Sequence, residues 1–330
     1  MSRNCATPEG TARSRDRFSN RAFREQQGLF LSSIGIGTYL GNADEATDAN
    51  YTRAIVRAVQ LGVNVIDSAA NYRFQRSERS IGQALQTLAN EHGIPREELV
   101  ICTKGGYLPF DGAPPRNVRQ YVEDTFVNPG IASFADIVGG SHCMTPAYLQ
   151  SQLDQSLRNM KIDCVDVYYI HNPESQLQFV SETEFYARLK LAFERLEQNR
   201  SDGKLAYYGV ATWNGFRTRP HHSLVRMVEA AREIGGEAHG FRFIQLPFNL
   251  AMAEAVDVAN ETIDGEEMSV VEAAKRLGVT VVASASLLQG RIPPADAIQF
   301  AGQTPGITTA LIGMSRVEHV EENLATDRHG

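Results

Sequence analysis

Residues 63–104, VNVIDSAANYRFQRSERSIGQALQTLANEHGIPREELVICTK, contain one complete repeat of the pattern that decides the fold. A short run rich in Val and Ile, residues 63–67, is followed by a stretch at 77–89 whose apolar residues fall at helical spacing. A second β-branched run follows at 99–103. Because a helix rather than a hairpin turn joins the two runs, we expect two parallel strands.

The same unit recurs along the rest of the chain. Runs rich in β-branched and aromatic residues alternate with stretches whose apolar residues recur every three or four positions. We therefore expect further strands at 164–171, 205–212, 243–247, 279–284 and 308–313, and an eighth at 31–37. We expect further helices at 48–61, 145–160, 182–199, 224–233, 269–277 and 317–324.

Eight strand–helix units predict a closed (β/α)8 TIM barrel of the α/β class, in a single domain with long βα loops at the carboxyl-terminal rim. An open, doubly wound sheet is the alternative, and it would begin with a glycine-rich turn between a strand and a helix. Residues 35–41, GIGTYLG, resemble that turn only superficially, because the third glycine is displaced by one position. We expect the barrel to span residues 28–330, after a flexible arm at residues 1–27.

The composition disfavours several classes of function. The 330 residues carry a formal net charge of −7, so nucleic acids and anionic membranes are poor partners. No apolar run reaches the roughly 20 residues that a membrane-spanning helix needs. Because Cys5, Cys102, Cys143 and Cys164 show no CxxC spacing, we expect neither a disulfide nor a metal site, and we expect a cytoplasmic protein.

Four polar residues fall at the carboxyl ends of expected strands, where a barrel of this kind has its active site. They are Asp67, Lys104, His171 and Gln245. A carboxylate or an ammonium group that is buried without a partner costs several kcal/mol. We therefore expect Asp67 and Lys104 to form an ion pair.

Tyr72 lies five residues after Asp67, near the same rim. A neighbouring lysine stabilises a phenolate and lowers the pKa of a phenol from about 10, which makes a tyrosine a usable acid. His171 can donate a hydrogen bond to a substrate oxygen on which negative charge develops. The set suits the reduction of a carbonyl group, for which a nicotinamide cofactor is implied as the hydride donor.

Four sequence blocks, in order along the chain, resemble those of the aldo-keto reductase superfamily. DSAANY at residues 67–72 and SERSIG at 77–82 are similar to the D-T-A-x-x-Y and S-E-x-x-[IL]-G patterns of that family. CTK at 102–104 and YIHNP at 169–173 are similar to two further blocks. The resemblance runs from about Phe30 to Leu324.

This resemblance implies a barrel that binds NADP(H), with NAD(H) as the less favoured cofactor, and that reduces the carbonyl group of a small aldehyde or ketone. It implies that Tyr72 is the proton donor, that Lys104 and Asp67 lower its pKa, and that His171 orients the substrate. Nothing in the sequence indicates a homo-oligomer. The cofactor-binding residues that the resemblance implies are Thr38, Asp67, Thr212, Trp213, Gln245, Ser284, Leu287, Gln289, Gly290, Gly313, Ser315, Arg316, His319, Glu322 and Asn323.

The block around the nicotinamide departs from the family pattern. Ala211 and Thr212 stand where the family has the serine and asparagine that hold the nicotinamide amide, whereas Gln245 matches the family's glutamine. Ser284 stands where the family has an aromatic residue that stacks on the nicotinamide ring. We expect Trp213 or a residue of a long loop to fill that space.

The adenosine end departs less from the pattern. Arg316 matches an arginine that holds the 2′-phosphate of NADP(H) through charge-assisted hydrogen bonds. His319 stands where the family has a second arginine, one helical turn further on. Because Arg316 is present, we expect NADPH to be preferred over NADH.

Two connections at the catalytic rim are unusually long. About 40 residues separate Lys104 from Thr145, whereas βα loops usually have about 2 to 6. We expect this connection either to line the substrate pocket or to be a surface decoration. A second candidate lid lies at 290–306. In the first connection, the residues that we expect to form an apolar lining are Tyr107, Phe110, Tyr121 and Phe126.

Three other functions remain open from the residues alone. Tyr186 and Lys190 fit the Y-x-x-x-K motif of short-chain dehydrogenases, although the glycine-rich fold of that class is missing. Lys104 is also a candidate Schiff-base nucleophile of an aldolase barrel. The third alternative is an NADP(H)-binding regulatory or sensor barrel with little turnover, similar to the β subunits of potassium channels, which Ala211, Thr212 and Ser284 would permit.

Overall fold

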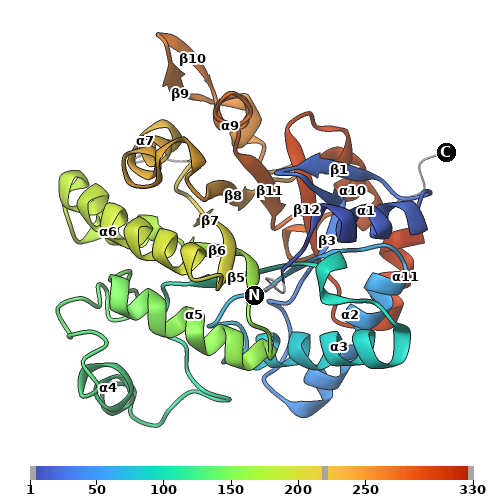
Figure 1. Cartoon of the computed structure of the whole chain (residues 1–330), viewed down its shortest axis with the longest axis horizontal. Coiled ribbons are helices and arrows are strands. Elements are labelled where there is room, and N and C mark those ends of the chain that lie inside the picture. The colour runs from blue at the N-terminus through green and yellow to red at the C-terminus, as the bar shows by residue number, and fades with distance from the viewer. Residues whose placement is uncertain (1–4, 218–221, 326–330) are drawn as a thin grey trace.

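The computed structural model describes residues 5–217 and 222–325 and contains a closed barrel of parallel strands (Figure 1). The order of the strands around the barrel is β11-β12-β3-β4-β5-β6-β7-β8, so the last two strands of the chain close the ring against the first. This confirms the predicted (β/α)8 barrel. The strands are β3 (Ile34–Gly37), β4 (Val65–Asp67), β5 (Val100–Gly105), β6 (Val165–His171), β7 (Leu205–Ala211), β8 (Phe241–Pro247), β11 (Thr280–Ser284) and β12 (Ile307–Gly313).

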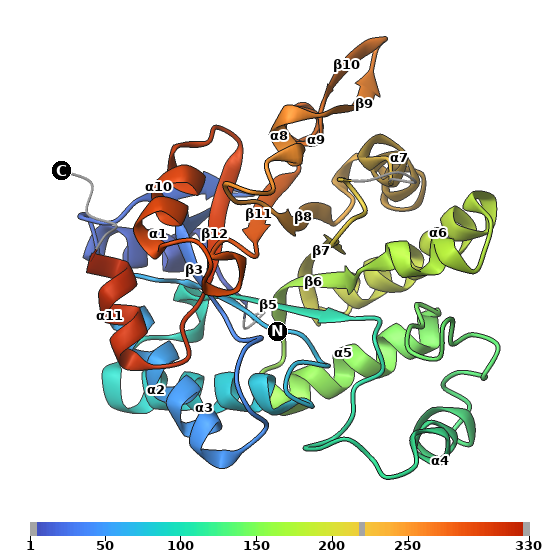
Figure 2. The ribbon, with the colours of Figure 1, turned by 180° about the vertical axis from the view of Figure 1, so that it is seen from behind.

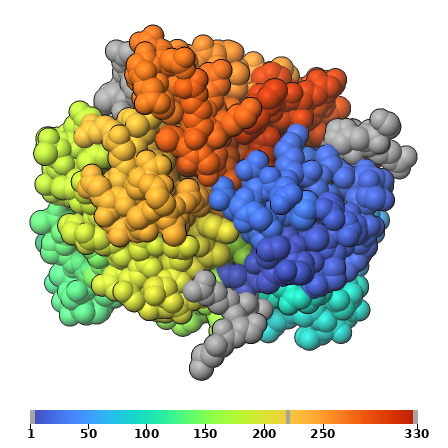
Figure 3. All heavy atoms as spheres, turned by 45° about the horizontal axis from the view of Figure 1, so that its top comes forward, coloured from blue at the N-terminus to red at the C-terminus, as the bar shows by residue number. Residues whose placement is uncertain are grey.

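A helix follows each barrel strand and covers the outside of the ring (Figures 1 and 2). In the space-filling view the blue N-terminal segment lies against the orange-red C-terminal segment (Figure 3). The helices that follow the strands are α2 (Glu45–Gln60), α3 (Arg76–His92), α5 (Pro146–Met160), α6 (Glu182–Ser201), α7 (Leu224–Gly235), α9 (Val270–Leu277), α10 (Pro294–Gln303) and α11 (Val317–Ala325).

Local sequence signals account for both ends of α9. The side chain of Ser269 accepts a hydrogen bond from the backbone N–H of Glu272 at 3.3 Å. The Glu272 carboxylate accepts one from the backbone N–H of Ser269 at 2.9 Å. This reciprocal pair is a capping box. Gly278 ends the helix in the left-handed conformation, with φ +67°.

Two apolar layers pack on either side of the barrel wall. Successive side chains of a strand point to opposite faces. In β6, Val167 and Tyr169 therefore join the cluster inside the barrel, whereas Tyr168 and Ile170 join the larger cluster between strands and helices. Every residue of β6 is buried, as expected for a strand covered on both faces.

The N-terminal segment closes the amino-terminal mouth of the barrel. It contains α1 (Pro8–Arg17) and the antiparallel pair β1 (Phe23–Gln26) and β2 (Leu29–Ser32). The backbone N–H of Ala6 donates to Asp166 at 2.6 Å, and Arg17 pairs with Glu98 at 2.8 Å. Asp166 lies near the start of β6, so this cap is at the opposite end of the strand from His171.

The cap differs from two expectations. We expected a flexible arm at residues 1–27, but residues 8–17 and 23–26 are folded onto the barrel, and residues 1–4 lie outside the described part of the chain. We also expected one strand at 31–37. The chain instead turns at Ser33, so β2 pairs with β1 in the cap and only β3 joins the barrel.

Cys5 and Cys164 form a disulfide between the cap and the residue before β6. Their Cα atoms are 5.4 Å apart, although 159 positions separate them in sequence. The expectation that the chain forms no disulfide is therefore wrong. Sequence spacing signals only local cysteine pairs, and this pair is brought together by the folded cap. The cysteines consequently no longer argue for a reducing compartment.

Two excursions leave the barrel on the side of the carboxyl-terminal rim. The connection from β5 to α5 contains α4 (Val118–Val122) and the turn η2 (Glu123–Val127). The connection from β8 to α9 contains α8 (Glu254–Asp257) and the hairpin of β9 (Ala259–Ile263) and β10 (Glu266–Ser269), which projects from the body in both ribbon views (Figures 1 and 2). The short helices η1 (Arg96–Glu98), η3 (Pro173–Gln178), η4 (Gly236–Ala238) and η5 (Leu288–Gly290) complete the described elements.

The described residues lack two further features. No helix within 5–217 and 222–325 has the length and apolar character that crossing a membrane requires. The same residues contain no group of three or more His, Cys, Asp or Glu side chains arranged to hold a metal ion.

Candidate active site

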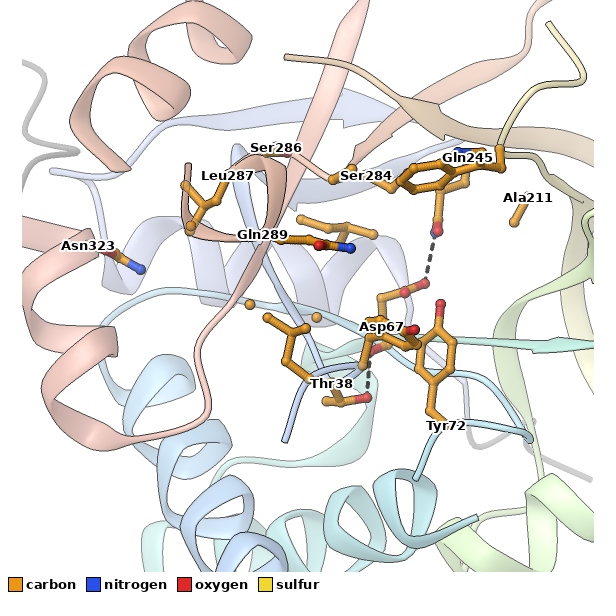
Figure 4. A pocket seen from close by; sticks show the side chains of 18 of the residues that line it. Thr38, Asp67, Tyr72, Ala211, Gln245, Ser284, Ser286, Leu287, Gln289 and Asn323 are labelled. Atoms are coloured by element: carbon orange, nitrogen blue, oxygen red, sulfur yellow. Dashed lines mark hydrogen bonds between the residues drawn. The ribbon is translucent and has the colours of Figure 1, made fainter. Parts of the chain in front are cut away.

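A pocket of about 420 Å³ opens at the carboxyl-terminal ends of the barrel strands. Side chains from the ends of β3, β4, β6, β7, β8, β11 and β12 line it, together with the loops that follow these strands (Figure 4). The barrel therefore brings residues from distant parts of the chain to one cavity, at the rim where the sequence predicted the active site. No other described cavity collects the strand ends in this way.

A buried ion pair lies at the base of this pocket. The Lys104 ammonium donates to Asp67 Oδ1 at 2.5 Å and to the backbone oxygen of Ser68 at 2.7 Å. The other carboxylate oxygen of Asp67 accepts a hydrogen bond from Gln245 Nε2 at 2.9 Å (Figure 4). Lys104 is 1% exposed, so its charge is neutralised inside the protein rather than by solvent. The predicted pairing of Asp67 with Lys104 is confirmed.

Tyr72 lies beside this ion pair. The Lys104 Nζ atom is 4.9 Å from the centroid of the Tyr72 ring, and Figure 4 shows the phenol pointing toward Asp67 and Gln245. Burial raises the pKa of Tyr72 above its ordinary value, and the charge of Lys104 opposes that rise. The nearby Asp67 carboxylate raises the pKa further.

The proximity of Lys104 to Tyr72 is therefore as expected, but the direction of the net pKa shift is not. We expected Lys104 and Asp67 both to lower the pKa of Tyr72. Only Lys104 acts in that direction, and the cost of placing a phenolate in a poorly solvated site outweighs it.

His171 completes the polar group. Its ring centroid is 5.7 Å from that of Tyr72, with the two rings nearly perpendicular at 75°. Burial, Lys104 and His142 all lower the pKa of His171 well below its ordinary value, so the imidazole is neutral at neutral pH. Its Nδ1 atom is buried and has no hydrogen-bond partner in the described structure. A neutral imidazole can donate one hydrogen bond to a bound oxygen.

A comparison with known proteins identifies the family of this chain. A sequence model described as "Aldo/keto reductase family" matches residues 33–296. The chain belongs to the aldo/keto reductase family. The sequence resemblance to that family is thus confirmed.

Curated proteins are similar in sequence to part or most of this chain. It is 26% identical over 191 residues to the NADH-specific methylglyoxal reductase of Escherichia coli strain K12, covering 56% of this chain and 49% of that protein. It is 23% identical over 335 residues to a Schizosaccharomyces pombe protein named as a voltage-gated potassium channel subunit beta, covering 92% and 86%. The match to the E. coli protein, like those to two further relatives, spans about half of the relative's length.

A solved aldo/keto reductase has the same fold. The enzyme from Klebsiella pneumoniae in complex with NADPH superimposes with a TM-score of 0.60 and 17% identity, covering 93% of this chain and 89% of that one. At this identity the likeness establishes the (β/α)8 architecture alone.

Most of the cofactor residues expected from the family line the pocket of this aldo/keto reductase. Ser315 and Arg316 are the exceptions, but Arg316 Nη2 lies 2.9 Å from His319 Nε2, and His319 is part of the lining. The expected residues that line the pocket are Thr38, Asp67, Thr212, Trp213, Gln245, Ser284, Leu287, Gln289, Gly290, Gly313, His319, Glu322 and Asn323.

Two buried hydroxyl groups of the lining have no partner in the described structure. Thr212 Oγ1 and Ser286 Oγ are both buried and make no hydrogen bond. Thr38, by contrast, donates to the backbone oxygen of Asp67 at 3.0 Å (Figure 4). Buried polar groups are normally satisfied. The two hydroxyls therefore mark places where a polar ligand can bind.

Trp213 and Ser284 both lie at the pocket. Both residues belong to the lining, and Trp213 is 42% exposed. The Glu174 carboxylate fixes the backbone of this loop, accepting hydrogen bonds from the N–H groups of Trp213 at 2.7 Å and Asn214 at 2.9 Å. Trp213 is thus an aromatic side chain in the lining, and its contact with a bound ring stays a prediction.

Sequence reasoning did not single out several of the lining residues. Tyr39 and Leu40 follow the expected Thr38, Asn172 follows His171, and Ser286 lies two residues after Ser284. Each is adjacent or nearly adjacent to a residue that we had singled out. Extending each expected strand end by three residues is the signal that would have found them.

The four aromatic residues of the β5–α5 connection do not line the pocket, which was one of the two roles we considered for it. None of Tyr107, Phe110, Tyr121 and Phe126 belongs to the lining. The Phe110 and Tyr121 rings are 5.4 Å apart, and Phe126 packs on Tyr148 of α5 at 5.2 Å. These aromatic residues face one another because the connection is long enough to bury a small core of its own. In the second candidate lid, Gly290 and Pro294 do line the pocket.

The Y-x-x-x-K motif lies on the outside of the barrel. The Tyr186 hydroxyl accepts a hydrogen bond from the backbone N–H of Ser223 at 3.1 Å, and Lys190 pairs with Glu233 of α7. Neither residue belongs to the pocket lining. A short-chain dehydrogenase site at this motif is therefore excluded.

Proposed function

We propose that this aldo/keto reductase catalyses the NADPH-dependent reduction of a small aldehyde or ketone to an alcohol. The observation that carries the proposal is the convergence of Tyr72, His171 and the buried Asp67–Lys104 pair at one pocket. Family membership supports the same reaction class. The match to about half of several curated relatives leaves the substrate itself open.

In the proposed reaction, Tyr72 and His171 act on the substrate oxygen. His171 donates a hydrogen bond that polarises the carbonyl and holds it against Tyr72. The Tyr72 hydroxyl then gives its proton to that oxygen as the alcohol forms. Lys104 stabilises the resulting phenolate, and Asp67 keeps the lysine charged and in place. When bound, a reduced nicotinamide supplies the hydride.

The residues present fit a nicotinamide dinucleotide. The unpartnered Thr212 hydroxyl and the Gln245 amide lie at the strand ends beside Asp67, where they can hold a carboxamide. The unpartnered Ser286 hydroxyl lies in the loop after β11 and can bind a second polar group of the ligand. Arg316 lies beside His319 of the lining and supplies the cationic side chain that a 2′-phosphate needs.

We infer NADPH rather than NADH from Arg316. The two comparisons point in different directions, because the Klebsiella structure holds NADPH whereas the E. coli relative is named as NADH-specific.

We propose the cytoplasm as the location of the protein. The Cys5–Cys164 bridge is an argument against this location.

A sensor barrel with little turnover is the second candidate. The similarity to the S. pombe protein along 92% of this chain favours it, as do Ala211, Thr212 and Ser284 at the nicotinamide end. The complete set of Tyr72, Lys104, Asp67 and His171 favours turnover instead.

A titration followed by an activity assay tests the proposal. Fluorescence of NADPH and NADH is measured against the full chain, and a panel of small aldehydes and ketones is then added to each complex. We expect tight binding of NADPH and steady turnover that Tyr72→Phe abolishes while the affinity for NADPH stays nearly unchanged. Binding of NADPH without any Tyr72-dependent oxidation would establish the sensor, and turnover by Tyr72→Phe at the wild-type rate would refute the acid role.

A further inference from the structure

The two ends of the long β5–α5 connection meet directly behind His171. Tyr107 and His142 form an antiparallel bridge, and the backbone N–H of Cys143 donates to the oxygen of Gly106 at 2.9 Å. The N–H of Leu108 donates to the oxygen of Ser141 at 2.8 Å. About 35 residues of connection are thus closed by a short clasp, defined here as residues 106–108 and 141–143.

His142 carries the contact from this clasp to the catalytic strand. Its Nε2–H donates to the backbone oxygen of His171 at 2.8 Å, and its Nδ1 accepts a hydrogen bond from Gln176 Nε2 at 2.9 Å. These two partners fix the tautomer of the ring, because Nε2 must carry the proton. Gln176 is held in turn by Arg188, which donates to Gln176 Oε1 at 2.8 Å.

The imidazole of His142 is buried and stays uncharged. It is 1% exposed, and burial lowers the pKa of His142 to about 4. The ring therefore keeps the same hydrogen bonds across the neutral pH range.

The backbone of the clasp leaves room for this ring. Gly106 has φ +140°, and a Cβ at that position would lie 2.8 Å from His142 Nε2 and 3.1 Å from the His171 backbone oxygen. Any side chain there would displace the hydrogen bond. The ring of Tyr107 then packs edge-on against both imidazoles, with centroids 5.2 Å from each. Its hydroxyl accepts from Asn172 Nδ2 at 3.3 Å and contacts Ser175 Oγ at 3.1 Å.

The catalytic imidazole itself lacks such support. His171 Nδ1 has no hydrogen-bond partner among residues 5–217 and 222–325, so no polar side chain there holds that nitrogen. Its direction is set by the backbone at the end of β6 and by the rings that pack on it. The clasp contributes to both, through His142 on the backbone oxygen and Tyr107 on the ring, in addition to the pairing of β6 with β7 and the ring of Tyr72.

We propose that His142 is a positioning residue for His171 and that the long β5–α5 connection serves to place it there. The inference rests on the proposed function, in which His171 holds the substrate oxygen. A misplacement of about 1 Å at a reacting group costs on the order of 100-fold in rate. The clasp thus keeps the histidine at the end of β6 aligned with Tyr72.

Two substitutions at His142 separate its hydrogen bond from its volume. His142→Phe fills the space without a donor, whereas Gln in His142→Gln places an N–H near the position of Nε2. We expect kcat/KM to fall by about 10- to 100-fold in His142→Phe, mainly through kcat, and to recover substantially in His142→Gln. NADPH affinity should be unchanged in both.

His239→Phe is the matched control. His239 is also buried, at 2% exposure, but it precedes β8 at the amino-terminal side of the barrel, far along the strand from the pocket. His239→Phe therefore reports how the replacement of a buried imidazole affects folding alone. We expect kcat/KM to change by less than about twofold in this variant. An equal loss in His142→Phe and His239→Phe would overturn the proposal.

A double variant shows whether His142 acts through His171. When two residues act as a unit, their effects are not additive. His142→Phe should therefore cause little further loss of kcat/KM in a His171→Ala background. A full and independent loss in that background would contradict a role through His171.

An NMR measurement tests the proposal independently of enzymatic activity. In protein labelled at histidine, the ring signals of His171 are assigned by their disappearance in His171→Ala. We expect them to broaden or split in His142→Phe and to stay sharp in His142→Gln and His239→Phe. If His171→Ala keeps full activity, the proposed function fails but this measurement still decides the positioning role; unchanged His171 signals in His142→Phe would rule that role out.

Discussion

Lys104 and Asp67 depend on each other for stability as well as for chemistry. Both side chains are buried, and Lys104 Nζ donates to Asp67 Oδ1 at 2.5 Å. Burial raises the pKa of Asp67, which means that the isolated carboxylate is disfavoured there, and Lys104 and Gln245 oppose that shift. Removing one partner of such a pair leaves an uncompensated buried charge, whereas removing both leaves none.

This dependence predicts a difference between single and double substitution. Lys104→Met should lower the free energy of unfolding by about 3–5 kcal/mol and abolish turnover. Lys104→Met with Asp67→Asn should recover much of the stability but none of the turnover, because Tyr72 still lacks its cation. Chemical denaturation and a carbonyl reduction assay measure the two effects. Recovery of activity in the double variant would show that Tyr72 needs no neighbouring charge.

Arg316 gives a second prediction at the scale of single residues. It is exposed, and its guanidinium lies against His319 at the edge of the pocket. If it binds the 2′-phosphate, Arg316→Ala should weaken NADPH by about 10- to 100-fold, the equivalent of losing a hydrogen bond to a charged group, and leave NADH unaffected. Fluorescence titration with both cofactors measures this.

The exposed Arg291 is the control for overall charge, since it lies on a nearby loop outside the lining. Arg291→Ala should change neither affinity. Equal losses for NADPH and NADH in Arg316→Ala would mean that Arg316 does not distinguish the two cofactors.

At the scale of elements, strong local signals were predictive and short irregular pieces were not. The helices at 182–199 and 269–277 appear as Glu182–Ser201 and Val270–Leu277, because periodic apolar residues and a capping box mark them. The hairpin of β9 and β10 was missed, since its strands have only five and four residues and neither shows a clear alternation of apolar and polar side chains. Its stability comes from tertiary contacts such as Glu261, which accepts the N–H of Leu224 at the start of α7.

The capping box provides a prediction for one of these elements. Ser269→Ala removes the oxygen that accepts the Glu272 N–H at the start of α9, and it should lower the free energy of unfolding by about 1 kcal/mol. Thr145 occupies the corresponding position of α5 but makes no such bond there. Thr145→Ala should therefore cost less. Thermal unfolding of the two variants measures the difference. An equal loss of stability would show that the Ser269 cap does not stabilise α9.

At the scale of the whole molecule, the sequence predicted the barrel and the strand-end residues but not how the barrel is closed at its other mouth. Strand ends are local features, and the topology of eight parallel strands brings Asp67, Lys104, His171 and Gln245 to one rim without further information. The cap depends on contacts between residues more than 80 positions apart, such as Arg17 with Glu98. No periodicity in the sequence reports contacts of that kind.

The Cys5–Cys164 bridge makes this cap part of the barrel's stability. The bridge closes a loop of 159 residues, and chain entropy predicts that a cross-link of this span stabilises the folded state by roughly 4–5 kcal/mol. Because it lies at the amino-terminal end of β6 and the pocket lies at the carboxyl-terminal end, breaking it should lower the melting temperature and leave kcat almost unchanged. Cys5→Ser measured with and without reductant tests this: the wild type should lose stability on reduction, the variant should not respond, and the two should then melt together. A variant that melts with the oxidised wild type would show that the cap holds without its covalent link.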